Sequence, residues 1–351
     1  MRADEKLTAF LELGSGDSRL RGILLTGRRN CRQTCASLTP LREPRINITT
    51  TNNDVEGPGG RSNGTLARHS LVFFFLLAFV FTWGYFWLVL APLKLPRAAY
   101  VLGGFGPAAA AFIMLGLTSG TWGVVALLRS IVHWRVGFQW YLLLLVGLPV
   151  LNVLAFLVIP GNLADFHAPD SQFLMLYLKE IAFSITLGVA PLWEEVGWRG
   201  FALPRLQRLY GPVVGTVILG LLWGVWHLPF FFGSFSQTRP DASFVSRSVA
   251  LVGFTIGLAG LSIIMTWVLN HCGGSTLMAI LAHAAFDSSG IALSGLFPST
   301  PPYYDPIHFQ TLGIAIVYTI AALVVIVATR GRLGYALNHQ EAGASPAPAE
   351  T

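Results

Sequence analysis

Ionisable side chains stand in three stretches of this sequence that are otherwise rich in apolar residues. They are Glu194, Glu195 and Arg199, then His227, and then His283 with Asp287. An ionisable group inside hydrocarbon is costly unless it is paired or faces a polar cavity, so such groups point to a functional site. Together the three sets supply a base, two histidines and a second acid, which are the groups that hydrolysis requires.

The first set lies within the run Trp193-Glu-Glu-Val-Gly-Trp-Arg199. Glu195 and Arg199 are four residues apart, so on a helix they share one face and can form an ion pair. Glu194 lies about 100° further round the helix and lacks that partner. A partly dehydrated carboxylate can act as a general base near neutral pH. Taken alone, the cluster is equally compatible with charged residues that end a span at the membrane interface.

The histidines allow more than one interpretation. His283 and Asp287 are four residues apart, so they face the same way on a helix. This spacing suits two ligands of one metal ion, or a histidine and an acid that act on one substrate atom. With Glu194 and His227 they could hold a zinc ion. Taken alone, a buried histidine such as His227 is more often a neutral residue hydrogen-bonded to a neighbouring helix than a functional group. The His283–Asp287 pair is equally compatible with a local brace of the helix bundle.

The elements that must position these groups are membrane-spanning helices. Only 11% of the 351 residues are charged and 53% are hydrophobic, whereas a soluble domain carries about 25% charged residues. Apolar runs of about 20 residues, enough to cross roughly 30 Å of hydrocarbon, recur after Leu71. They cover approximately 71–92, 98–118, 139–159, 173–196, 212–233, 247–270, 275–296 and 309–330. The sequence therefore predicts an all-α, polytopic transmembrane helix bundle with about eight spans.

The two ends of the chain differ from this domain in composition. Residues 1–69 are rich in Arg, Ser, Thr, Asn and Gly and show no sustained apolar period, which predicts a disordered leader. Residues 333–351, rich in Ala, Pro and Glu, predict a disordered tail. The transmembrane domain is expected over 70–332. Eleven of the 23 basic residues precede Ser70, a placement that suits an anionic cytoplasmic leaflet and not a nucleic acid.

Loop charges give the expected orientation of the spans. With the leader inside, seven basic residues fall on the inner side and four on the outer side. The inner set is Arg129, Arg135, Arg199, Arg205, Arg208, Arg330 and Arg332, and the outer set is Lys94, Arg97, Arg239 and Arg247. The excess predicts that both termini are cytoplasmic, in an integral protein of the cell membrane.

The three polar sets resemble the motifs of a known family. Glu-Glu-x-x-x-Arg at 194–199, aromatic-x-x-x-His at 223–227 and His-x-x-x-Asp at 283–287 are similar to those of the CAAX protease and bacteriocin-processing (CPBP, or Abi) family. That family includes the prenyl endopeptidase of the endoplasmic reticulum. The resemblance covers about 170–290, a third of the chain. It implies an intramembrane endopeptidase that acts on a peptide or membrane-protein substrate.

The resemblance also implies a role for each residue. Glu194 would activate the attacking water with help from His227, and Glu195 and Arg199 would hold the site together. His283 and Asp287 would polarise the scissile carbonyl and stabilise the oxyanion. The prenyl endopeptidases carry Asn at the last position; Asn can donate a hydrogen bond to an oxyanion, but ionised Asp cannot. Family resemblance favours a site without a cofactor and leaves zinc open.

Two other functional classes fit the same composition. An ion-coupled transporter also keeps acids and histidines inside its spans. A membrane scaffold or immunity factor could keep the family fold and bind a partner without cutting it. A complete set of acid and base groups favours the peptidase.

Overall fold

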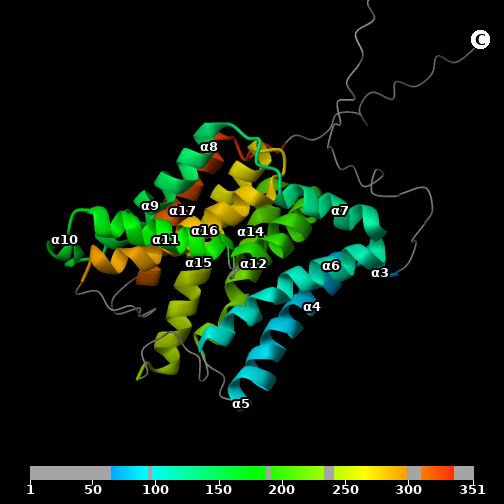
Figure 1. The fold of residues 1–351 in the computed structure, drawn as a ribbon, viewed down its shortest axis with the longest axis horizontal. Helices are drawn as coiled ribbons and strands as arrows, with labels where there is room; N and C mark the ends of the chain where they lie inside the picture. The colour runs from blue at the N-terminus through cyan, green and yellow to red at the C-terminus, as the bar shows by residue number, and fades with distance from the viewer. Residues whose placement is uncertain (1–64, 94–96, 187–190, 233–240, 299–309, 336–351) are drawn as a thin grey trace, which may run out of the picture. The chain divides into compact units, whose positions relative to one another are not determined.

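The computed structural model describes residues 65–93, 97–186, 191–232, 241–298 and 310–335. Every regular element in these ranges is helical (Figure 1). The helices are α3 Thr65–Arg68, α4 Ser70–Gly84, α5 Ala91–Leu93, α6 Gly106–Thr118, α7 Gly120–Ile131, α8 Phe138–Leu142, α9 Leu148–Leu157, α10 Asn162–Asp165, α11 Ser171–Thr186, α12 Pro191–Gly197, α13 Leu203–Tyr210, α14 Pro212–Trp226, α15 Phe244–His271, α16 Thr276–Ala292 and α17 Gln310–Ala328. The predicted all-α fold is therefore confirmed. The leader and tail predictions fall almost wholly outside the described residues.

Helices occur at all eight predicted spans, but fewer than eight have full length. Four are long and apolar enough to cross a membrane: Ser70–Leu93, Phe138–Leu157, Phe244–His271 and Thr311–Ala328. A fifth span exists if Ser171–Thr186 and Pro191–Tyr210, bent by 54°, count as one. The segments at 98–118, 212–233 and 275–296 form apolar helices of 17 residues or fewer. Packing partners within the bundle, rather than lipid alone, surround these shorter helices.

One apolar helix was not predicted at all. α7 covers Gly120–Ile131 and follows α6 after a single residue, Ser119. It packs against α6 and against α16, and a hydrogen bond of 2.8 Å joins Ser130 to Thr276 at the start of α16. Its 12 residues are too short for a span. Apolar runs of about 20 residues predict only the longer helices, so they do not predict α7.

α15 is the central helix of the described bundle. Its apolar window is 67% buried, against 22–39% for the other long helices, and α14, α16 and α17 pack on it. Small residues allow the close approach: a Cβ at Gly220 or Gly224 of α14 would lie 2.6 Å from atoms of Ala259 or Thr255 on α15. Membrane helices, which lack a hydrophobic force between them, commonly pack through such contacts. This contact brings the C-terminal end of α14 against α15.

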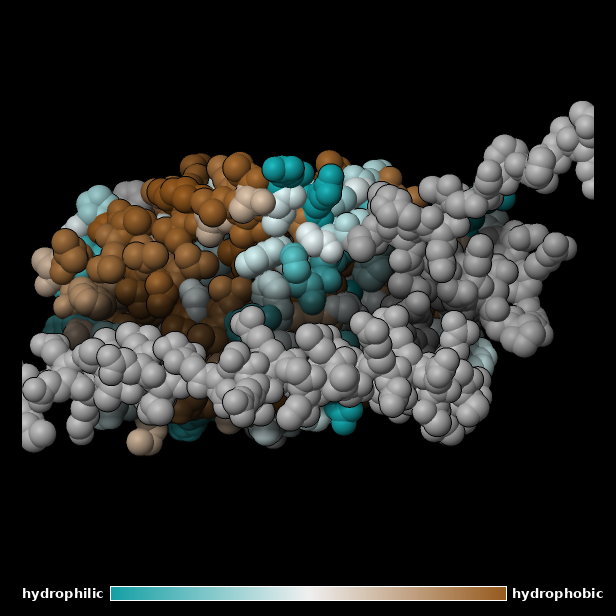
Figure 2. Space-filling model, turned by 90° about the horizontal axis from the view of Figure 1, so that it is seen from above, coloured by the Kyte–Doolittle hydropathy of each residue, from teal (hydrophilic) through white to brown (hydrophobic). Residues whose placement is uncertain are grey.

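Many large apolar side chains face outward. Leu88, Val80 and Val327 are among the exposed ones, and Figure 2 shows hydrophobic residues gathered over a broad area of one face. A water-soluble protein rarely exposes so large an apolar area. The surface, together with the apolar helices, establishes an integral membrane protein.

The contact between α6 and α12 yields a test of the packing. A Cβ at Gly197 would lie 2.5 Å from the Cβ of Pro107 and 2.6 Å from its carbonyl group. Gly197→Ala should lower the free energy of unfolding by about 1–3 kcal/mol, because the packed backbone at Pro107 cannot move away from the added methyl group. Gly116→Ala is the control, since nothing lies within 4 Å of its Cβ. Unfolding in detergent micelles measures both; equal stability of the two variants would contradict the packing.

Candidate active site

The acid-rich segment lies on a helix of irregular pitch. α12 begins at Pro191 and continues through a π-helical turn, Trp198–Ala202, into α13. Such turns occur often at functional sites, because they redirect side chains within a helix. Glu194 and Glu195 are 3% and 0% exposed, and Arg199, in the π-helical turn, is 1% exposed. The prediction that Arg199 adds to the charge of an inner loop is therefore wrong.

Glu195 connects two separate segments of the bundle. Its Oε1 accepts a hydrogen bond from Arg199 Nη1 at 2.9 Å, as the four-residue spacing predicts. The same oxygen lies 2.9 Å from Nδ1 of His283 on α16. Arg199 also donates from Nη2 to Ser262 Oγ of α15 at 2.8 Å, and its guanidinium stands 4.2 Å over the Trp223 ring. These contacts hold α12, α14, α15 and α16 around one buried charge cluster.

Glu194 has a different partner from its neighbour. Its Oε2 accepts a hydrogen bond of 2.8 Å from Nε1 of Trp223 on α14. Within the described part of the chain, its other carboxylate oxygen has no hydrogen-bond partner. A buried carboxylate with one oxygen fixed and one oxygen open is suited to bind and orient a water molecule.

His227 lies within the predicted span 212–233, directly after Trp226, the last residue of α14. Its Nδ1 lies 2.8 Å from the carbonyl oxygen of Trp223. A carbonyl oxygen only accepts, so Nδ1 carries a hydrogen; in the neutral ring this leaves Nε2 as an acceptor. Rings of Trp226 and Phe254 pack against the imidazole with centroids 4.9 and 5.1 Å away.

His283 and Asp287 share one face of α16, as predicted. Nε2 of His283 is 3.4 Å from Oδ2 of Asp287, a separation long for a strong hydrogen bond. His283 is buried, whereas the Asp287 side chain is 38% exposed. Trp223 lies beside His283 as well, with ring centroids 5.1 Å apart. Thus the three predicted polar sets meet around Trp223.

Trp223 and Ser262 also belong to this cluster. The motif at 223–227 includes Trp223 without giving it a role, and Ser262 is in none of the motifs. Trp223 donates to Glu194 and accepts from His227, so it ties the first set to the second. The available signal was its position four residues before His227, where a helix brings the backbone carbonyl next to the histidine. Ser262 gave no signal, because a lone serine in a long apolar helix is common.

The predicted metal ligands do not form a metal cage. Among the described residues, no group of three His, Cys, Asp or Glu side chains is placed to hold a metal ion. Their donor atoms already face other groups: Glu194 meets Trp223, and His283 meets Glu195 and Asp287. The residues do not fit the zinc site that the sequence allowed, and we derive no step through a metal.

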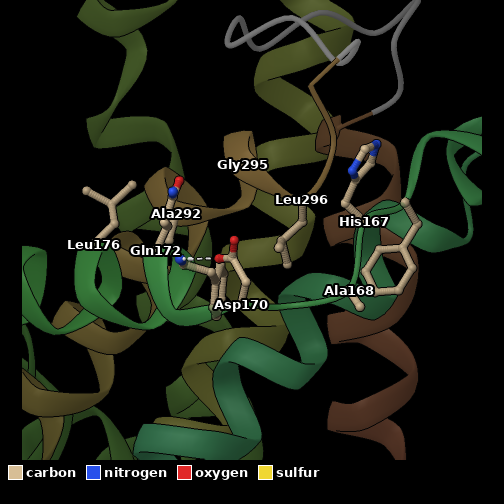
Figure 3. Close-up of a pocket in the computed structure, with 10 residues that line it drawn as sticks. His167, Ala168, Asp170, Gln172, Leu176, Ala292, Gly295 and Leu296 are labelled. Atoms are coloured by element: carbon tan, nitrogen blue, oxygen red, sulfur yellow. Dashed lines mark hydrogen bonds between the residues drawn. The ribbon is translucent and has the colours of Figure 1, made fainter.

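A cavity of about 490 Å³ lies near the C-terminal end of α16 (Figure 3). Its lining includes His167, Asp170 and Gln172 and, from α16, Ala292. Ala292 follows Asp287 by five residues, or about 7.5 Å along the helix. None of the six predicted site residues lines this cavity. It therefore lies next to the acid and histidine cluster without containing it.

Comparison with known proteins supports the motif assignment. The family described as Type II CAAX prenyl endopeptidase Rce1-like matches residues 178–289, a range that holds all six predicted site residues. A protein named CAAX prenyl protease 2, from Methanococcus maripaludis, is 25% identical over 142 residues, which are 40% of this chain and 51% of the relative. The segment 178–289, which matches this family model, is called the CAAX-protease region. The chain spans about half the length of this curated relative.

The CAAX-protease region coincides with the structural cluster described above. It begins within α11 and ends within α16, so it contains the helices that carry the acid pair and both histidines. α4, α6, α9 and α17 lie outside it, yet α6 packs on α12, and α9 and α17 pack on each other. The family match therefore covers the cluster and leaves part of its supporting shell to the rest of the chain.

The buried ion pair of the CAAX-protease region yields a stability prediction. Arg199→Met should lower the free energy of unfolding by about 3–5 kcal/mol, because it leaves the Glu195 charge buried with one partner fewer. Arg205→Met is the control, since Arg205 donates to the backbone carbonyl of Phe201 on its own segment. Chemical unfolding in detergent measures the difference. A loss no larger for Arg199→Met than for Arg205→Met would show that the cluster is not held by this pair.

Proposed function

We propose that this protein is an intramembrane endopeptidase that hydrolyses a peptide bond of a peptide or membrane protein near the membrane surface. The observation that carries the proposal is the meeting of Glu194, His227 and His283 around Trp223. It is also supported by the match of residues 178–289 to the family of type II CAAX prenyl endopeptidases and by the similarity to CAAX prenyl protease 2 of Methanococcus maripaludis.

Glu194 acts as the general base in this proposal. Its open oxygen removes a proton from a water molecule while the water oxygen attacks the carbonyl carbon of the scissile peptide bond. Nε2 of His227, an acceptor, takes the hydrogen bond of the second water hydrogen and so orients the nucleophile. When the C–N bond breaks, Glu194 returns its proton to the leaving nitrogen, and the products are a carboxylic acid and an amine.

His283 stabilises the oxyanion in this proposal. Both ring nitrogens face carboxylate oxygens, an arrangement that is satisfied when both carry hydrogen. The bond at Nδ1 is short at 2.9 Å, whereas the contact at Nε2 is 3.4 Å. The loosely held Nε2–H is therefore available to the carbonyl oxygen as it gains negative charge. Asp287 orients this ring and needs no proton of its own.

The orientation in the membrane is part of the proposal. Ser275 Oγ donates to the carbonyl of His133, and Asn270 Nδ2 donates to the carbonyl of Leu333. These bonds place the C-terminal ends of α7, α15 and α17 next to one another, where Arg129, Arg330 and Arg332 lie. Such a basic end fits the cytoplasmic side of a cell membrane, with the C-terminal end of α17 facing the cytoplasm. The N-terminal prediction concerns residues outside the described ranges.

A glutamine variant tests the general base. Glu194→Gln should reduce cleavage about 100-fold to 10,000-fold, because an amide cannot accept the water proton. Glu180→Gln on α11 is the matched control, outside the cluster, and should cleave normally. The measurement compares new peptide termini in membranes that contain each variant. Equal cleavage by both variants would reject Glu194 as the general base; ion flux into vesicles without any cleavage would favour the transporter.

Two variants at position 287 test the role of the second acid. Asp287→Asn should keep cleavage within about tenfold of the wild type, because asparagine can still accept from His283 and can also donate to an oxyanion. Asp287→Leu removes the orienting group, and we expect a loss of about 100-fold or more. Turnover of one peptide substrate measures both. Loss of cleavage in Asp287→Asn as complete as in Asp287→Leu would show that a charged carboxylate is required.

A further inference from the structure

A second polar cluster lies outside the acid and histidine site. Asn152, on α9, donates from Nδ2 to the carbonyl oxygen of Phe286 at 2.9 Å and to Ser289 Oγ at 2.7 Å, both on α16. Its Oδ1 accepts a hydrogen bond of 2.7 Å from the hydroxyl group of Tyr318 on α17. All three side chains are buried, with 3% exposure at most. One amide therefore joins three helices.

Burying the Asn152 amide in an apolar span costs free energy, and this cost argues that the amide has a role. Asn152 lies inside an apolar span, Phe138–Leu157, and a polar group there is expensive unless it is fully bonded. Its donor and acceptor atoms are both used. A neighbouring bond, from Ser289 Oγ to the Phe286 carbonyl at 3.0 Å, closes the cluster. The same turn is also held by ring packing of Phe286 on Tyr318, with centroids 5.4 Å apart.

The turn held in this way contains Asp287. Residues 286 and 289 are fixed by the amide, and Asp287 lies between them. The Asp287 side chain is 38% exposed, and among the described residues its polar contact is the 3.4 Å approach to His283. Its position is therefore set mainly by the backbone of the turn, and that backbone is anchored from outside the site by α9 and α17.

We propose that Asn152 and Tyr318 are positioning residues of the site, which fix the turn that carries Asp287 and, through it, the orientation of His283. The role in cleavage rests on the proposed function, but the placement of the turn does not. Neither α9 nor α17 lies within the family region at 178–289, so the proposal assigns a part in the site to helices outside that region.

Cleavage kinetics test the catalytic half of the proposal. Asn152→Leu should lower kcat about 10-fold to 100-fold at unchanged KM, because a shift of about 1 Å in a reacting group can cost 100-fold. Tyr318→Phe removes a single hydrogen bond and should show a smaller loss of kcat, again at unchanged KM. This variant tests the proposal if Asn152→Leu does not fold. Thr276→Val is the matched control, since it removes a hydroxyl bond of 2.8 Å to Ser130 at the opposite end of α16.

A double-mutant cycle separates positioning from general stability. If Asn152 acts through Asp287, then Asn152→Leu should lower kcat little further when Asp287→Leu is already present. Additive losses, or a loss in Thr276→Val equal to that in Asn152→Leu, would overturn the proposal. A rise in KM without a change in kcat would overturn it as well.

Thiol labelling tests the placement of the turn without any cleavage. Asp287→Cys is made with Cys31, Cys35 and Cys272 all changed to Ser, and a water-soluble maleimide is added to the protein in detergent. Asn152→Leu should change the labelling rate at position 287 at least about threefold, while Thr276→Val should leave it unchanged. The same rate in all three proteins would overturn the proposal. If the rate changes but the wild type cleaves nothing, the proposed function fails and the positioning of the turn stands.

Discussion

The structure of the site depends on the one oxygen of Glu195 that faces both Arg199 and His283. A carboxylate buried at 0% exposure must have partners that offset its lost hydration. Arg199 comes from the same helical segment, but His283 comes from α16, 88 residues later. The requirement to pair this charge therefore fixes the position of one helix against another. Trp223 lies within the same arrangement, with the Arg199 guanidinium over its ring and its N–H group on Glu194.

The division of labour between the two neighbouring glutamates follows from helix geometry. Side chains one residue apart point in directions about 100° apart, so Glu195 faces α16 while Glu194 faces α14. Glu195 Oε1 faces Arg199 and His283, while Glu195 Oε2 is buried without a hydrogen-bond partner among the described residues. Glu194 bonds Trp223 through its Oε2.

Part of this arrangement could be read from the sequence, and part could not. Helical spacing correctly placed Glu195 next to Arg199 and His283 next to Asp287, because contacts four residues apart need only the local periodicity. The bond between Glu195 and His283 joins distant segments, and spacing carries no information about it. Helices occur at all eight predicted spans, but α14 and α16 are shorter than a full span and pack part of their apolar surface on other helices. Composition alone does not separate protein neighbours from lipid. The leader and tail predictions remain predictions.

Asn152 shows where sequence reasoning fails most clearly. Ionisable residues stood out against the apolar background, but one asparagine in a run of leucines and valines gave no comparable contrast. The role of Asn152 depends on contacts among three helices that are far apart in the chain and meet only in the folded protein. A bilayer cannot satisfy a stray polar group, so in such a bundle each buried polar contact either holds helices together or does chemistry. On α16 these two kinds of polar contact are adjacent. Glu195 holds the ring of His283, and Asn152 holds the turn that follows. The partly exposed Asp287 is therefore positioned by its neighbours and not by a strong hydrogen bond of its own.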